Sequence, residues 1–160
     1  VVLDKNNAKS SPVVTVVPLT SVKPHTDTTN LKNGSIFLGN ELFTNLNSKI
    51  SMVDRKVKSE IDELEKLVAD ASKKASSEHF STIDTKLGTA RKELELLAKM
   101  RAEVLKMKHG SIALVSQITT VSKIRIYDPQ TDHDILSGIK LSNEKLDLID
   151  YEIRKSFTNF

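Results

Sequence analysis

The sequence predicts an α+β protein in which a long helical hairpin interrupts a small β-sheet. Short runs rich in β-branched residues, bounded by Pro, Gly and Asn, occur on both sides of the middle of the chain. The middle, residues 41–108, has no proline, a single glycine and dense charge. Its apolar residues recur at alternating spacings of three and four, which is the heptad pattern of packed helices.

The first strand is predicted at residues 13–17, where all five side chains are β-branched. Such a run indicates a strand buried on both faces, and its simplest partner is a hairpin strand at residues 1–3. Pro18 has no N–H to donate to a ladder, so pairing should stop near it. After a polar loop that ends in Asn33–Gly34, residues 35–38 predict another short strand.

The central stretch predicts two helices of about 30 residues, each about 45 Å long. The polar break at residues 75–79 favours an antiparallel hairpin over the rival, a continuous rod of about 100 Å that dimerises with a second chain. Two equal antiparallel helices return the chain to its starting point. We therefore expect residues 41–108 to be inserted between two neighbouring strands of a domain formed by residues 1–40 and 109–160.

The C-terminal third predicts more strands and one helix. Residues 111–115 read as a buried strand, and residues 117–126 as a strand pair or one bent strand. A short edge segment is expected at Ile135, Leu136 and Ile139. Ser142 should cap the last helix, whose apolar face should pack on the sheet and consists of Leu146, Ile149, Ile153 and Phe157.

Composition excludes several classes of function. The chain has no cysteine and four scattered histidines, so we expect no disulfide, thiol chemistry or zinc site. No apolar run approaches the roughly 18 residues of a membrane helix, and no signal peptide is visible, which suits a cytoplasmic protein. The net charge of +3 permits an anionic partner such as RNA. Because the chain opens at Val1 without Met, we expect the protein to begin upstream.

Thr20 and Ser21 are the candidate chemical groups that the residues themselves indicate. They follow the strand and Pro18, where two hydroxyls are held at the end of a rigid element. The competing interpretation is an ST-type turn with no chemical role. Composition and spacing leave both interpretations open.

Outside the central helices, the chain resembles the MazF/PemK family of toxin endoribonucleases. Residues 14–21, Val-Thr-Val-Val-Pro-Leu-Thr-Ser, are similar to the family's apolar strand ending in P-(I/L)-T-S. Residues 111–126 are similar to a second signature, roughly S-V-x-L-x-Q-I-R-T-V-D-K-x-R-L. Residues 138–142, with the helix from Asn143, are similar to a closing G-x-L-S-x-E helix. The resemblance covers about 90 residues, with the three motifs in the family's order.

The resemblance implies a small, strongly twisted antiparallel β-barrel with a C-terminal helix. It also implies a homodimer, held in check by a cognate antitoxin, that cuts single-stranded RNA without a metal or cofactor. The substrate's own 2′-hydroxyl attacks the adjacent phosphate and leaves a cyclic phosphate. Thr20 matches the catalytic threonine and Ser21 its neighbour. Donation of a hydrogen bond from Thr20 to the phosphate in the transition state would contribute about 3 kcal/mol.

The chain departs from the family at several charged positions. The family's catalytic arginine belongs to an Arg-Pro pair that would precede Val1, a further arginine falls at Thr119, and an aspartate falls at Ser122. The candidate phosphate contacts that remain are Lys23, His25, Lys123 and Arg125. The long helical insertion is not typical of the family, and it suits an antitoxin contact, a dimer element or a regulator.

A non-catalytic binding module is the alternative interpretation. CcdB-like gyrase poisons share the same barrel and bind protein without cutting nucleic acid. A coiled-coil adaptor built on a degenerate toxin domain is a second form of this alternative. An Arg-Pro pair and a Gly-rich loop upstream of Val1 would favour the nuclease.

Overall fold

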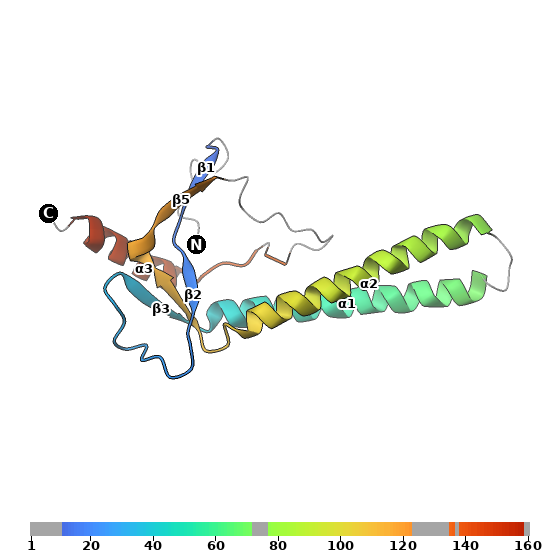
Figure 1. Cartoon of the computed structure of the whole chain (residues 1–160), viewed down its shortest axis with the longest axis horizontal. Helices are drawn as coiled ribbons and strands as arrows, with labels where there is room; N and C mark the ends of the chain where they lie inside the picture. The colour runs from blue at the N-terminus through green and yellow to red at the C-terminus, as the bar shows by residue number, and fades with distance from the viewer. Residues whose placement is uncertain (1–10, 72–76, 123–134, 137, 159–160) are drawn as a thin grey trace.

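A computed structural model describes residues 11–71, 77–122, 135–136 and 138–158. A long helical hairpin projects from a small group of strands, and a shorter C-terminal helix lies at the opposite end of the molecule (Figure 1). The α+β character predicted from the sequence is confirmed.

The predicted closed barrel is wrong, because the described strands form two separate antiparallel sheets. β1 (Val13–Val16) pairs with β5 (Thr119–Ser122) in a two-stranded sheet. β4 (Ser111–Leu114) is the central strand of the other sheet, between β2 (Leu19–Ser21) and β3 (Ser35–Gly39).

The switch between the two sheets occurs at Val17–Pro18. The chain leaves β5 after Val16 and joins β4 at Leu19, because Pro18 has no N–H with which to continue the first ladder. The Pro18 carbonyl still accepts a hydrogen bond from the Leu114 N–H at 3.0 Å. The prediction that pairing ends near Pro18 is therefore confirmed for the ladder of β1 and β5. A second ladder, of β2 and β4, begins directly after Pro18.

The sequence predicted that β1 would be buried on both faces, and this prediction is wrong. Val13 is 39% exposed and Val14 only 4%, so only part of the strand is covered. A two-stranded sheet has little area with which to shield either face, so a β-branched run here does not become a fully buried strand. The predicted partner at residues 1–3 lies outside the described residues, and the partner that the structure shows is β5.

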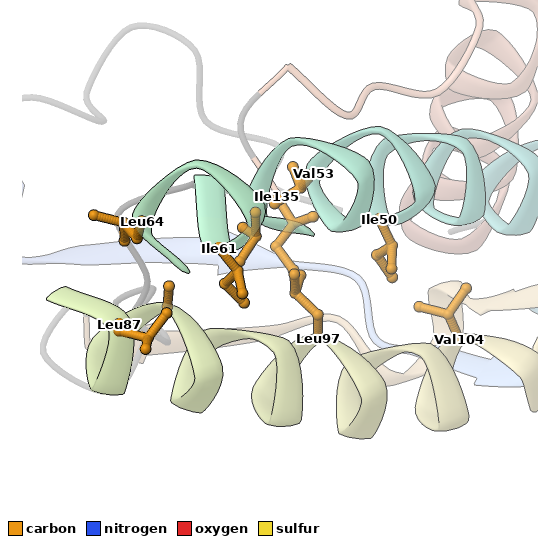
Figure 2. Packing of buried hydrophobic residues seen from close by; sticks show 10 residues of the cluster. Ile50, Val53, Ile61, Leu64, Leu87, Leu97, Val104 and Ile135 are labelled. Atoms are coloured by element: carbon orange, nitrogen blue, oxygen red, sulfur yellow. The ribbon is translucent and has the colours of Figure 1, made fainter. Parts of the chain in front are cut away.

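The antiparallel helical hairpin is confirmed. α1 (Glu41–Ala71) and α2 (Ser77–Leu105) pack side by side along their length (Figure 1). Side chains of the two helices point toward one another along the seam, from Leu64 and Leu87 at one end to Ile50 and Val104 at the other (Figure 2). The heptad spacing gives each helix one apolar stripe, and burial of that stripe stabilises the hairpin.

The hairpin lies between two neighbouring strands, as predicted. β3 leads into α1, α2 leads back to β4, and β3 and β4 are antiparallel partners. A bulge between Phe37 and Gly39 shifts the register, and the Leu38 side chain within it is almost fully buried. This pairing fixes both ends of the hairpin at one place on the sheet.

A second core lies between the sheet and the C-terminal helix. α3 (Asn143–Thr158) packs on β3 and on the 3-10 turn η1 (Val115–Gln117) that follows β4. The buried residues of this core are Val17, Leu38, Leu42, Ala113, Val115, Leu141 and Ile149. The predicted C-terminal helix and its packing on the sheet are confirmed for the described residues.

Two contacts from the segment before α3 tie the hairpin to this core. Ser142, which directly precedes α3, donates its backbone N–H and its hydroxyl to the Glu41 carboxylate in the first turn of α1, the hydroxyl at 2.9 Å. The predicted edge segment contains no strand among its described residues. Instead, Ile135 is 2% exposed and packs in the seam of the hairpin (Figure 2).

Gly110, where α2 returns to β4, should be the least replaceable glycine of the junction. Its φ is +106°, and an added Cβ would lie 2.5 Å from Phe37 Cε2 and 3.0 Å from the Gly39 carbonyl oxygen. We expect Gly110→Ala to lower the free energy of unfolding by about 3 kcal/mol, because a strained φ and a steric clash add. Urea denaturation followed by circular dichroism measures it.

Gly39→Ala is the matched control for this substitution. Gly39 also has a positive φ, +70°, but an added Cβ would meet open space. It should lower the free energy of unfolding by about 1–2 kcal/mol, since only backbone strain acts. Equal losses in the two variants would contradict the tight packing at Gly110.

Candidate functional site

Thr20 lies on an exposed edge of the three-stranded sheet. β2 is an edge strand, and Thr20 is paired with Ile112 of the central strand. The Thr20 side chain is exposed, whereas Ser21 is half-buried. Because successive side chains of a strand point to opposite faces, the two hydroxyls do not share a face. Of these two side chains, that of Thr20 is therefore the more exposed to solvent.

Ser111 is a buried hydroxyl that the sequence analysis missed. It is directly opposite Ser21 in the ladder, so their side chains lie on one face of the sheet. Ser111 is 1% exposed, and its Oγ has no hydrogen-bond partner within the described part of the chain. Its position at the start of an otherwise apolar strand was the available signal.

Lys23 and His25 lie in the turn that follows β2. The Thr26 N–H donates to the Lys23 carbonyl at 3.1 Å, and His25 has a φ of +68°. Pro24 in the second position and a positive φ in the third are typical of a type II turn. Glycine or asparagine is usual in the third position, so His25 is held there at a cost of about 1–2 kcal/mol. Both Lys23 and His25 are exposed.

The base of the hairpin brings two further candidate residues to the end of the β2–β4 ladder. The Val22 N–H donates to the Gly110 carbonyl at 3.0 Å, which extends the β2–β4 ladder by one residue. Lys23 follows Val22, and Lys108 and His109 precede Gly110, so the two segments leave the ladder at the same end. Lys108 and His109 are exposed. The sequence analysis missed them because 85 residues separate Lys108 from Lys23.

Asp27 is the carboxylate nearest to these cations along the chain. Its Oδ1 accepts hydrogen bonds from the Thr29 hydroxyl at 2.6 Å and from the Thr29 N–H at 2.9 Å. These two bonds, the hydroxyl first, hold the pKa of Asp27 below its usual value. The Asp27 carboxylate therefore fixes the loop after Lys23 through its hydrogen bonds with Thr29.

Lys123 and Arg125, the other candidate phosphate contacts, lie outside the described residues. Thr119 and Ser122, where the resembling family has an arginine and an aspartate, form the ends of β5. Thr119 is opposite Val16 and Ser122 is opposite Val13. The N-terminal end of β5 therefore lies nearer to β2, and its C-terminal end, at Ser122, lies farther away.

Thr20 lies on an open surface of the sheet. Thr20 is exposed and does not line any of three clefts, which lie beside α3, on α1 and at the hairpin seam. Across the residues that the structure describes, no three His, Cys, Asp or Glu side chains gather as metal ligands. None of the helices in that part of the chain is long and apolar enough to cross a membrane.

Comparisons with known proteins found no match. No protein-family model, curated protein or solved structure matches this chain. The function must therefore be argued from the residues and their geometry.

The pKa of Asp27 offers a direct check of the loop. We expect NMR titration to give a carboxyl pKa below 3.8 in the folded chain. Because the folded pKa is depressed, the stabilisation is present above the unfolded pKa and is lost as the pH falls through the folded one. Thr29→Val should move the pKa upward, toward 3.8, because it removes the hydroxyl donor. Thr28→Val is the control, and equal titration curves in both variants would exclude this cause.

Proposed function

We propose that this chain is a toxin-type endoribonuclease that cuts single-stranded RNA without a metal, using Thr20. One observation carries the proposal. The three stretches that resemble the MazF/PemK family come together around β4, although the helical hairpin separates the first stretch from the other two in the sequence. β2 from the first stretch pairs with β4 from the second, and α3 from the third packs on η1, which directly follows β4.

The chemistry uses the substrate's own nucleophile. The ribose 2′-oxygen forms a bond to the adjacent phosphorus, the bond from phosphorus to the 5′-oxygen breaks, and a cyclic phosphate remains. The Thr20 hydroxyl donates a hydrogen bond to a phosphate oxygen as charge develops, and we assign phosphate contacts to Lys23, in the turn after β2, and to Lys108, at the base of the hairpin. The 2′-hydroxyl gives up its proton and the leaving 5′-oxygen takes one up, and we assign these two transfers to His25 and His109, which are both exposed.

The proposal includes the partners that the family resemblance implies. Single-stranded RNA is the substrate, a cognate antitoxin is the inhibitor, a second copy completes a homodimer, and the cytoplasm is the location. The exposed edge position of Thr20 supports access by a long, flexible substrate, because the hydroxyl is not enclosed in a cavity.

A non-catalytic protein-binding module is the second candidate. The observation in its favour is an apolar cleft of about 470 Å³ at the base of the hairpin. Leu46, Met100 and Leu136 are among its lining residues, and Leu136 is 50% exposed. Such a cleft on a helical hairpin is typical of a surface that receives a partner helix. Under this alternative, Thr20 has no chemical role.

Incubation of the purified protein with a long single-stranded RNA in EDTA tests the nuclease proposal. We expect cleavage at short fixed sequences, with cyclic phosphate ends. Thr20→Val keeps the shape of the side chain but removes the hydroxyl, and it should slow cleavage about 100-fold, the effect of losing one transition-state donor.

Thr20→Ser is the matched control, because it keeps the hydroxyl and should retain most of the activity. RNA that stays intact with folded wild-type protein free of antitoxin, or cleavage that is equally fast in Thr20→Val, would contradict the proposal. The first of these results would favour the binding module.

A further inference from the structure

The charges of the hairpin are separated along its length. The base, residues 41–58 and 99–108, has eight Lys or Arg against three Asp or Glu, a net charge of +5. The distal part, residues 59–98, has six against nine, a net charge of −3. The near balance over the whole hairpin hides this difference. The basic part is the one that adjoins the sheet (Figure 1).

Several of the basic side chains form a path from α2 to the end of β2. Lys99 lies in the last two turns of α2, and Lys106 directly follows the end of the helix at Leu105. Lys108 and His109 follow in the turn before Gly110, whose carbonyl accepts the N–H of Val22, the residue before Lys23. All five side chains are exposed. We call Lys99, Lys106, Lys108, His109 and Lys23 the basic path.

Most of this positive charge is available to a ligand. Lys106 pairs with Glu103 at 2.6 Å, but both side chains are well exposed, so solvent weakens the pair. Two other pairs at the base engage Asp54, which interacts with Lys58 and Arg101. Within the described part of the chain, neither Lys99 nor Lys108 forms an ion pair.

We propose that the basic path binds the phosphates of single-stranded RNA and guides the strand to Thr20, so that the hairpin belongs to the substrate-binding surface. This inference rests on the proposed nuclease function and extends its site onto the insertion. A backbone with one negative charge per nucleotide is attracted by a line of lysines and is repelled by the acidic distal part. The strand therefore approaches at the base of the hairpin.

Binding of a fluorescent RNA oligonucleotide with 2′-O-methyl riboses tests this path, because that RNA cannot be cleaved by its own 2′-hydroxyl. The base variant Lys99→Gln, Lys106→Gln, Lys108→Gln is compared with the distal variant Lys66→Gln, Lys86→Gln, Lys92→Gln. Both remove three exposed lysines of the hairpin, so their net charges are equal. Fluorescence anisotropy gives the affinity at several salt concentrations.

We expect the base variant to bind at least about tenfold more weakly at 0.1 M salt. Its plot of log affinity against log salt should be less steep by about 2, because each phosphate contact on a single strand contributes about 0.7. The distal variant should bind as the wild type does or slightly more weakly. Unfolding curves check that both variants are folded.

Equal affinities in the two variants would overturn the basic path. Cleavage of ordinary RNA, measured in parallel, separates this failure from that of the nuclease. Thr20-dependent cleavage with no loss of affinity in the base variant would leave the nuclease standing without the path. Loss of affinity in the base variant, with no cleavage by the wild type, would support the path and reject the nuclease.

Discussion

The pairing of β4 with a strand on each side is the constraint on which the rest of the structure depends. On one side β4 pairs with β3, and this closes the helical hairpin at its base. On the other side it pairs with β2, and the ladder continues to the bond between Val22 and Gly110. The same strand therefore holds the insertion in place and sets its base beside Thr20.

Local sequence patterns predicted the helices well, but they did not predict most of the contacts between segments that are distant in the sequence. Heptad spacing and the polar break were enough for the antiparallel hairpin, and equal helix lengths were enough to place it between neighbouring strands. The barrel was wrong because closure depends on which ladder each strand joins after Pro18. Of the candidate site, Thr20 and Lys23 were named, but Lys108 and His109 were missed, since only strand pairing brings them near.

The hairpin is attached to the sheet by more than its two chain connections. Ile135 packs in the hairpin seam, Leu141 packs in the sheet core, and Ser142 donates to Glu41 at the start of α1. The segment before α3 thus contacts both cores. An insertion held at several points keeps a fixed orientation, which a substrate-binding surface requires.

Native-state hydrogen exchange measures most directly whether β4 unites the hairpin base and the strands. If it does, the amides of Ile112 and Leu114 will open with the same free energy and denaturant dependence as those near Ile50 at the base of α1. Amides in the distal part of the hairpin will exchange sooner. Protection that is high throughout the hairpin but low in β4 would contradict this, because the hairpin would then be stable without the sheet.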